Sequence, residues 1–251
     1  MKLVILAAGK GKRMGASSEH TPKPILKYQD KTLLHHKLEQ LPSDINEVII
    51  VIGHLGNKIV EALGHSYKNT NGVSLPITYV EQTELLGTAD SLWRTRARLG
   101  SEPFLILMGD DLYAKKDLEE MIKTHKEHDN AWVALVHPQN EHISYGKCIL
   151  DENGFLIDFR NDPDKIVSEN LMYTGACILT SEVFKLPMRK VGTVEYGLPQ
   201  TFIQEERHAN AKNKVGSGTE NDSEENTARQ NVHVVKTSFW KRITAPEDLE
   251  N

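Results

Sequence analysis

The sequence predicts an α/β fold: a mostly parallel, Rossmann-like sheet with helices on both faces, followed by a small β-rich part. Three observations lead to this prediction. Apolar segments typical of strands alternate with segments of helical periodicity from residue 2 to about residue 138. The strand segments are apolar throughout, as parallel strands covered on both faces usually are. After residue 138, hairpin signals replace this alternation.

The first part of the chain supplies the alternating strands and helices. Strands are expected at residues 2–8, 47–53, 76–82, 103–111 and 131–138. Helices are expected at residues 32–42, 57–64, 88–99 and 115–128. Pro42 should stop the first helix, Gly64 should follow the second as its terminal residue, and Thr88 should cap the third. Such βα units build a parallel sheet.

The second part is predicted to be richer in β-structure. Residues 145–162 should form a hairpin around Asn153-Gly154, a dipeptide that strongly favours tight turns. Further strands are expected at residues 172–180 and 232–237, and helical segments at 180–186, 197–207 and 245–250. Residues 208–231 are polar and contain a single valine, so we expect a mobile insertion that buries too little apolar surface to fold.

Composition is that of an ordinary globular protein. The chain has 251 residues, enough to bury a core, and a net charge of −5, which gives no basic footprint for a nucleic-acid polymer. Its two cysteines, Cys148 and Cys177, form no disulfide framework, as is typical of a reducing cytoplasm. No apolar run approaches the ~20 residues of a membrane span. We therefore expect a soluble, cytoplasmic protein without a membrane partner, and we leave a homo-oligomer open.

Three strand ends predict a ligand site. Gly9, Gln82 and Asp110 stand at or near the ends of the first, third and fourth strands. Ligands of open α/β sheets bind beyond the carboxyl ends of the strands. We therefore expect these three residues on one rim of the sheet.

The segment LAAGKGKRMG, residues 6–15, follows the first strand and admits three interpretations. A Walker A loop would need Ser or Thr where Arg13 stands. A dinucleotide fingerprint would need a glycine where Met14 stands. In the third interpretation, Gly9 and Gly11 let the backbone wrap a triphosphate closely through its N–H groups.

A second cationic stretch strengthens the third interpretation. Pro22 and Pro24 stiffen the chain on either side of Lys23, so that this lysine can serve as a fixed cation. Lys10 and Lys12, in contrast, are expected to be solvated.

These motifs resemble those of the sugar-phosphate nucleotidyltransferases, enzymes that join a nucleoside triphosphate to a sugar 1-phosphate. LAAGKGKRM and PKPIL carry the resemblance, and it extends through EQTELLGTADSL (81–92), LILMGDD (105–111), YGKCILDENG (145–154), YTGA (173–176) and VEYGLPQTF (194–202). It therefore covers nearly the whole chain. It implies the nucleotide-diphospho-sugar transferase fold in a single domain, 1–251, with a nucleotide-binding half (1–138) and an acceptor-binding, sugar-binding half (139–251).

The resemblance also implies the reaction and the residues that carry it. A phosphate oxygen of the sugar phosphate attacks the α-phosphorus of the nucleotide, and pyrophosphate leaves. Arg13 would stabilise the leaving group, and Lys23 the bridging oxygens. Asp110 would bind Mg²⁺, the expected cofactor, although it could instead cap the following turn. The nucleotide-binding residues implied are Leu6, Ala7, Ala8, Gly9, Gly11, Gln82, Gly87 and Thr88.

The side chain of Gln82 bears on the nucleobase. Its amide offers an acceptor and adjacent donors that complement N3–H and O4 of uracil or thymine. The spacing from Gln82 to Gly87 resembles that of uridylyl- and thymidylyltransferases. The alternative is a glutamine that only ends a strand.

Acceptor-binding residues are implied in the second half of the chain, at Gly146, Asn161, Thr174, Glu195 and Arg242. Gly146 would let the substrate approach the backbone, and Glu195 either binds sugar hydroxyls or stays solvated. Many relatives have Glu-Lys-Pro where this chain has Asn161-Asp162-Pro163. Relatives also have a metal-sharing aspartate at the place of Arg242, which cannot ligate Mg²⁺ but can bind a phosphate, so a second metal ligand is left open.

Three functions follow as alternatives. The first is transfer of a nucleoside monophosphate from UTP or dTTP to a sugar 1-phosphate. The second is a cytidylyltransferase acting on a polyol-type phosphate, suggested by Asp162, Arg242 and the segment KRITAPEDL, which resembles the end of the cytidylyltransferases of isoprenoid synthesis. The third is a nucleotide-sugar sensor without catalysis, against which the intact Arg13, Lys23 and Asp110 argue.

Overall fold

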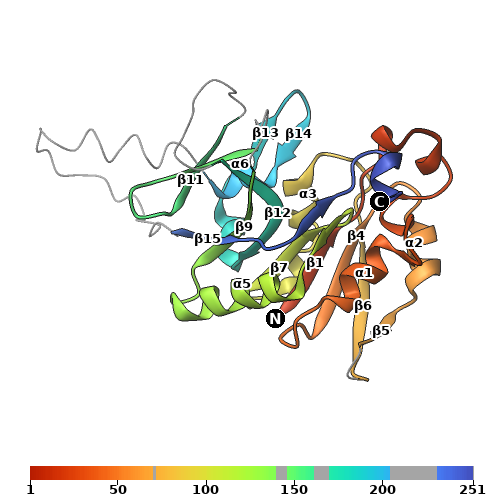
Figure 1. Cartoon of the computed structure of the whole chain (residues 1–251), viewed down its shortest axis with the longest axis horizontal. Helices are drawn as coiled ribbons and strands as arrows, with labels where there is room; N and C mark the ends of the chain where they lie inside the picture. Colours follow the sequence, from red (N-terminus) through yellow and green to blue (C-terminus); the bar gives the residue numbers. More distant parts are fainter. Residues whose placement is uncertain (70–71, 140–145, 161–169, 204–230, 251) are drawn as a thin grey trace, which may run out of the picture.

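The computed structural model describes residues 1–69, 72–139, 146–160, 170–203 and 231–250, and it confirms the predicted α/β architecture (Figure 1). Within these ranges the central sheet is mixed and has ten strands. Its main path runs β11 (Leu156–Arg160), β10 (Lys147–Leu150), β12 (Leu171–Leu179), β7 (Phe104–Met108), β1 (Lys2–Leu6), β4 (Glu47–Ile52), β6 (Ser74–Glu81) and β5 (Ser66–Lys68). The four strands β7, β1, β4 and β6 are parallel neighbours, which places their carboxyl ends on one rim.

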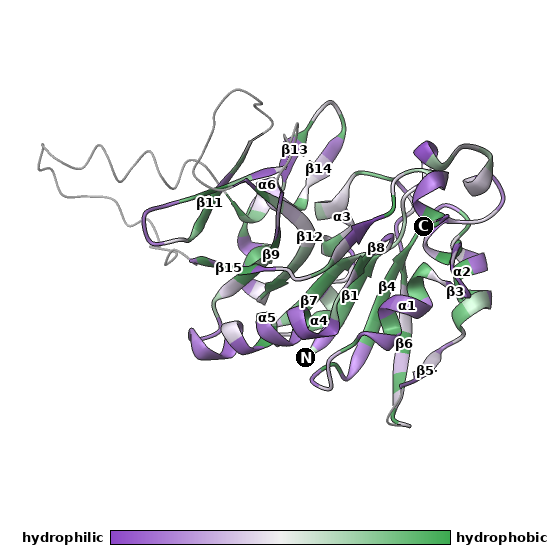
Figure 2. Cartoon of the chain, in the orientation of Figure 1, coloured by the Kyte–Doolittle hydropathy of each residue, from purple (hydrophilic) through white to green (hydrophobic). Residues whose placement is uncertain are grey.

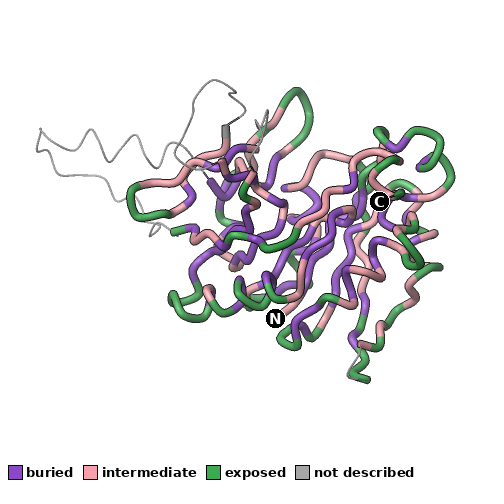
Figure 3. Tube along the Cα trace, viewed as in Figure 1, coloured by how far each residue is buried: buried purple, intermediate pink, exposed green. Residues whose placement is uncertain are grey.

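Apolar side chains cover both faces of this sheet, because successive residues of a strand point to opposite sides. Along β1, Leu3 and Ile5 join one core cluster, whereas Val4 and Leu6 join the other. The strands β4, β7 and β9 (Trp132–Pro138) divide in the same way. Figure 2 shows these strands as the apolar centre of the molecule, and Figure 3 shows them buried. The continuous apolar runs of the sequence therefore reflect a sheet that is buried on both of its faces.

Helices supply the other half of each core. The helices α1 (Leu33–Glu39), α2 (Gly56–Leu63) and α5 (Lys115–Glu127) bury apolar residues in one cluster. The helices α3 (Thr88–Trp93), α4 (Arg96–Leu99) and α6 (Leu198–Phe202) do so in the other. In α5, Leu118, Met121, Ile122 and His125 are buried at helical spacing, and the charged residues between them face solvent. The predicted helices on both faces are thus confirmed.

The predicted helix 88–99 is wrong in detail, because the chain forms α3 and α4 instead of one helix. Thr95 lies between them, fully buried, and its hydroxyl donates to the Leu92 carbonyl at 2.7 Å. A hydroxyl that bonds to a carbonyl of the preceding turn competes with regular helical hydrogen bonding. Thr88 is not the cap either: the N-cap is Gly87, and Thr88 Oγ1 accepts the Leu198 N–H at 2.9 Å.

The second part of the chain completes the sheet. The predicted hairpin is confirmed as the antiparallel pair β10 and β11. The strand β12 lies between β7 and β9 and is antiparallel to both, and β15 (Val232–Lys236) adds to β9 in parallel. A separate two-stranded ribbon pairs β13 (Arg189–Val191) with β14 (Glu195–Gly197). The helical segments predicted at 180–186 and 245–250 are present as short 3₁₀ helices, η3 (Ser181–Lys185) and η4 (Pro246–Leu249).

The predicted strand 103–111 ends early, at Met108, and a short strand β8 (Asp111–Tyr113) follows it. This strand pairs with β16 (Trp240–Arg242) near the end of the chain, which sets Arg242 opposite Asp111. The Asp117 carboxylate fixes the approach to β16, accepting the Thr237 hydroxyl at 2.6 Å and the Phe239 N–H at 3.2 Å. The C-terminal segment is therefore tied back onto the rim of the sheet.

Some predictions fall on residues that the structure does not describe. Asn161, Asp162, residues 208–230 of the expected insertion and residues 204–207 of the helix predicted at 197–207 lie outside the described ranges. The division into two functional halves at residue 138 stays a prediction. Among the described helices, none is long and apolar enough to cross a membrane.

Candidate active site

The loop after β1 turns at Gly11, as a phosphate-wrapping loop would require. Gly11 has φ 64°, and its carbonyl accepts the Met14 N–H at 2.8 Å and the Ser18 hydroxyl at 2.9 Å. A Cβ on Gly11 would lie 3.3 Å from the Cβ atoms of Lys23 and Ser18. A positive φ and so close an approach together favour glycine. The 3₁₀ turn η1 (Lys12–Ser18) starts directly afterwards and exposes Arg13.

A glycine also brings Asp110 to this loop. The Gly109 N–H donates to the Leu6 carbonyl at 2.9 Å, and a Cβ on Gly109 would lie 2.8 Å from the same oxygen. Only a residue without a side chain allows the end of β7 to approach the end of β1 so closely. Asp110 follows immediately, with its side chain 32% exposed.

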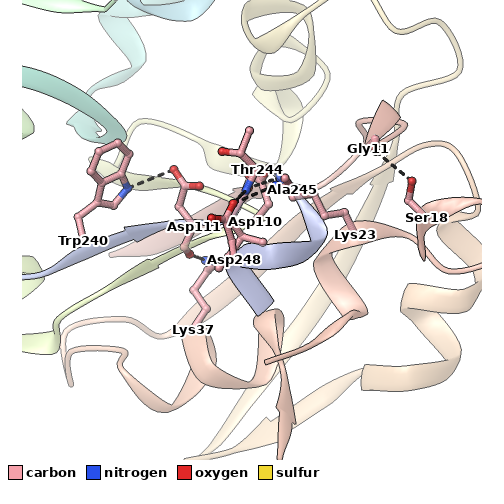
Figure 4. A network of polar contacts seen from close by, with 11 residues as sticks. Gly11, Ser18, Lys23, Lys37, Asp110, Asp111, Trp240, Thr244, Ala245 and Asp248 are labelled. Atoms are coloured by element: carbon pink, nitrogen blue, oxygen red, sulfur yellow. Dashed lines mark hydrogen bonds and ion pairs between the residues drawn. The ribbon is translucent and has the colours of Figure 1, made fainter. Parts of the chain in front are cut away.

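Lys23 is the fixed cation expected from its flanking prolines. It belongs to the 3₁₀ turn η2 (Lys23–Ile25) and is 7% exposed. Its Nζ lies 2.6 Å from Asp110 Oδ2 and also donates to the Ile243 carbonyl. Figure 4 shows Lys23 and Asp110 beside the C-terminal segment that carries Thr244 and Ala245.

Two adjoining cavities open at this point. The larger, about 560 Å³, is lined by Leu6 to Arg13, Gln82, Gly87 and Thr88, together with Glu195 and Tyr196. The smaller, about 280 Å³, is lined by Gly146, Phe159, Tyr173, Thr174, Gln200, Trp240 and Arg242. Arg13, Lys23, Thr88, Met108 and Asp110 line both. The predicted site residues within the described ranges are therefore brought together, and the two cations and the carboxylate stand where the cavities meet.

Lys10 and Lys12 are exposed, as the sequence predicted. Both nevertheless line the larger cavity. A solvated lysine at this place can therefore still contact a ligand in the cavity.

The amide of Gln82 is held by its neighbours. Gln82 is 3% exposed, and its Nε2 donates to the Gly87 carbonyl at 3.1 Å and to Asp90 Oδ2 at 2.8 Å. Its Oε1 accepts the Ser91 hydroxyl at 2.7 Å. Both amide hydrogens are used, and one lone pair of Oε1 remains. The sequence analysis expected the Gln82 amide both to donate to a base and to accept from it. In this arrangement the amide can only accept a hydrogen bond from a base.

Gly87 closes the larger cavity against the second half of the chain. It has φ 95°, and a Cβ on it would lie 2.4 Å from the Tyr196 carbonyl oxygen. The Tyr196 N–H donates to the Leu86 carbonyl at 2.7 Å. This backbone-to-backbone contact requires glycine and links the loop before α3 to β14.

The predicted acceptor residues divide between the cavities. Gly146 and Arg242 line the smaller one, whereas Glu195 lines the larger. Thr174 also lines the smaller cavity, but it is 1% exposed and its hydroxyl donates to the Leu135 carbonyl at 2.9 Å. Thr174 therefore stands at the predicted place, but the hydrogen of its hydroxyl is used within the sheet.

Two buried charged residues near Asp110 escaped the sequence analysis as site residues. Asp111 is 6% exposed and accepts from Trp240 Nε1 at 3.2 Å, and Lys37 Nζ donates to the Asp111 carbonyl (Figure 4). Burial, reinforced by Asp110, raises the pKa of Asp111 to about 7, and burial lowers the pKa of Lys37 to about 8. Lys37 carried a readable signal, since it lies on the apolar face of its helix between buried leucines.

The residues present fit a magnesium ion that phosphates help to hold. Within the described part of the chain, no three His, Cys, Asp or Glu side chains gather as a metal cluster. Mg²⁺ commonly takes one or two carboxylates and completes its shell with water and substrate phosphates. Asp110 is a hard oxygen donor on the lining of both cavities and meets that requirement.

Comparisons with known structures agree with this fold. UDP-glucose pyrophosphorylase complexed with UDP-glucose superposes with a TM-score of 0.75 at 19% identity, covering 99% of this chain and 95% of that one. The inositol-1-phosphate CTP transferase from T. maritima superposes with a TM-score of 0.70 at 19% identity, covering 98% and 90%. The fold is thus that of the nucleotide-diphospho-sugar transferases.

Sequence comparisons give the family. The nucleotidyl transferase family matches residues 2–218, and the chain belongs to it. The UTP–glucose-1-phosphate uridylyltransferase AglF of Haloferax volcanii is 28% identical over 187 residues, 73% of this chain and 74% of AglF. The catalytic subunit beta of mannose-1-phosphate guanylyltransferase from Drosophila melanogaster is 26% identical over 212 residues, 83% of this chain and 56% of that protein. The resemblance expected from the motifs is confirmed, while the relatives differ in the nucleotide named.

Proposed function

We propose that this protein transfers a nucleoside monophosphate from UTP or dTTP to a sugar 1-phosphate in the cytoplasm and releases pyrophosphate. The observation that carries the proposal is the junction of the two cavities. Arg13, Lys23 and Asp110 line both, so a triphosphate in the larger and a phosphorylated acceptor in the smaller would meet at these three side chains.

The roles follow from the position of each charge. An oxygen of the acceptor phosphate attacks the α-phosphorus, the bond from that phosphorus to the bridging oxygen breaks, and pyrophosphate leaves. Arg13 is exposed at the start of η1, where it can follow the departing pyrophosphate. Lys23 is held rigidly, and a preorganised cation stabilises developing charge without reorganising.

Asp110 is the residue that would hold Mg²⁺. When bound, the ion supplies charge neutralisation on the phosphates. Lys23 already contacts one carboxylate oxygen of Asp110, which keeps that carboxylate oriented toward the junction.

The acceptor side favours one alternative enough to retain it. Arg242 pairs with Asp111 between β16 and β8, and both line the smaller cavity. The Arg242 guanidinium can form two parallel hydrogen bonds to an acceptor phosphate. That feature suits a polyol phosphate as well as a sugar 1-phosphate, and a cytidylyltransferase acting on such an acceptor is the second candidate.

One assay separates these functions. The protein is mixed with Mg²⁺, with UTP, dTTP, CTP or GTP in turn, and with a panel of sugar 1-phosphates and polyol phosphates, and pyrophosphate is measured. Turnover with UTP or dTTP and a sugar 1-phosphate supports the proposal. Turnover only with CTP and a polyol phosphate supports the second candidate, and tight nucleotide binding without turnover supports a sensor.

A further inference from the structure

We infer that Asp90 and Arg94 are positioning residues that set nucleobase selectivity by locking the orientation of the Gln82 amide. The inference rests on the proposed function, because it takes Gln82 as a residue that faces the base. Neither Asp90 nor Arg94 is among the described residues that line the larger cavity, whereas Gln82 and Ser91 are.

The lock begins with an ion pair on α3. Arg94 Nε lies 2.8 Å from Asp90 Oδ2, one helical turn away. The same oxygen accepts from Gln82 Nε2 at 2.8 Å. Asp90 is 9% exposed and forms this ion pair with the Arg94 guanidinium. An ionised carboxylate only accepts hydrogen bonds.

The Asp90 carboxylate allows the Gln82 amide only one orientation. The nitrogen of Gln82 must face Asp90, because the opposite orientation would set Oε1 against a carboxylate oxygen. The Gly87 carbonyl takes the second amide hydrogen and is likewise only an acceptor. Ser91 adapts, since its hydroxyl can donate or accept, and here it donates to Oε1 at 2.7 Å. The orientation is therefore decided by Asp90 and the Gly87 carbonyl.

Selectivity follows from the lone pair that remains on Oε1. It can accept from a ring N–H, which uracil, thymine and guanine carry. Cytosine has a bare ring nitrogen at the corresponding place, and two acceptors facing each other repel. An amide free to rotate would accommodate either kind of base. Asp90 thus selects against cytosine without touching the nucleotide.

The test measures selectivity in an isosteric variant. In Asp90→Asn the side chain can donate as well as accept, so only the longer contact with the Gly87 carbonyl, at 3.1 Å, still opposes a turned Gln82 amide. Binding of UTP and CTP is measured by calorimetry, and pyrophosphate release with each is measured in parallel. We expect the preference for UTP over CTP to fall about tenfold or more, mainly through a lower KM and Kd for CTP, while kcat with UTP changes little.

Two further variants keep the result interpretable. Arg94→Ala changes a side chain that is 29% exposed. It leaves the Asp90 carboxylate as an acceptor but no longer holds it in place, so the preference should fall in the same direction by a smaller factor. Glu120→Gln removes one partner of the exposed pair with Lys123 on α5 and should leave the preference unchanged. If Asp90→Asn and Arg94→Ala both bind UTP and CTP with the wild-type ratio, the inference is wrong even where the wild-type enzyme is active.

A different result would contradict the proposed function. Wild-type protein that binds UTP but releases no pyrophosphate contradicts the transferase proposal, and the ratio of dissociation constants still tests the lock. Wild-type protein that prefers CTP, or binds neither nucleotide in this cavity, overturns the inference together with the base assignment.

Discussion

Lys23 Nζ lies 2.6 Å from Asp110 Oδ2, although 87 positions separate the two residues in the chain. Their contact joins the turn after the glycine loop to the end of β7, and it stands at the junction of the two cavities. The pair gives the site a fixed positive charge and a fixed carboxylate side by side.

The first prediction concerns this pair. Asp110→Asn should abolish pyrophosphate release, because a neutral amide cannot replace the carboxylate proposed to hold Mg²⁺. Lys23→Ala should lower kcat by about 10²- to 10³-fold, the usual cost of removing one preorganised donor. Thermal unfolding should show that Asp110→Asn keeps its fold.

The matched control is another aspartate–lysine pair. Asp44 and Lys126 form an exposed ion pair, and neither is among the described residues that line the two cavities, so Asp44→Asn should leave turnover unchanged. Wild-type turnover in Asp110→Asn would rule out the metal-binding role.

The second prediction compares two glycines with positive φ. A Cβ on Gly87 would collide with the Tyr196 carbonyl, whereas a Cβ on Gly100 meets nothing within 4 Å. Gly100→Ala should cost only the conformational strain, about 1–3 kcal/mol. Gly87→Ala should destabilise more and should also raise the KM for the nucleotide, because the loop must separate from β14. Urea unfolding and steady-state kinetics measure the two effects, and equal effects on KM in both variants would contradict the contact argument.

The third prediction tests the acceptor side. Arg242→Gln should raise the KM for the phosphorylated acceptor by about tenfold or more, as expected when a charge-assisted hydrogen bond is lost. The KM for the nucleotide should change much less, because Arg242 lines only the smaller cavity. The measurement varies acceptor at saturating nucleotide and then the reverse. A larger increase in the KM for the nucleotide would mean that Arg242 binds the triphosphate and not the acceptor.

The fourth prediction concerns pH and His125, which is 1% exposed in α5. Its Nδ1 donates to the Ala131 carbonyl at 2.7 Å, and burial lowers the pKa of His125 below its ordinary value of 6.5. The unfolded chain then takes up a proton at higher pH than the folded chain does. Stability is therefore full above pH 6.5 and is lost as the pH falls through the folded pKa.

The variant His125→Gln removes this titration. Free energies of unfolding in urea are compared for wild type and variant at about pH 7.5 and about pH 5.5. The wild type should lose more stability on acidification than the variant does. An equal loss in both would show that His125 does not contribute to the acid sensitivity.

Local pattern was sufficient for much of the site. The glycines of the loop after β1, the prolines around Lys23 and the carboxylate after β7 are all legible in short stretches of sequence, because strand periodicity and turn chemistry act over a few residues. The same local rules misjudged Thr88, whose hydroxyl serves Leu198 in the other half of the chain. They also could not show that the Thr174 hydroxyl is taken by Leu135.

By itself, the sequence determined which segments are strands buried on both faces, and that a glycine-rich, cationic loop follows the first of them. Only the tertiary structure decided which polar groups meet: that Lys23 pairs with Asp110, that β16 sets Arg242 opposite Asp111, and that Asp90 holds Gln82. Hydrophobic periodicity is a property of neighbouring residues, so it can be read along the chain. A hydrogen-bond partner is selected by how distant strands and helices pack, and that selection exists only once the sheet has formed.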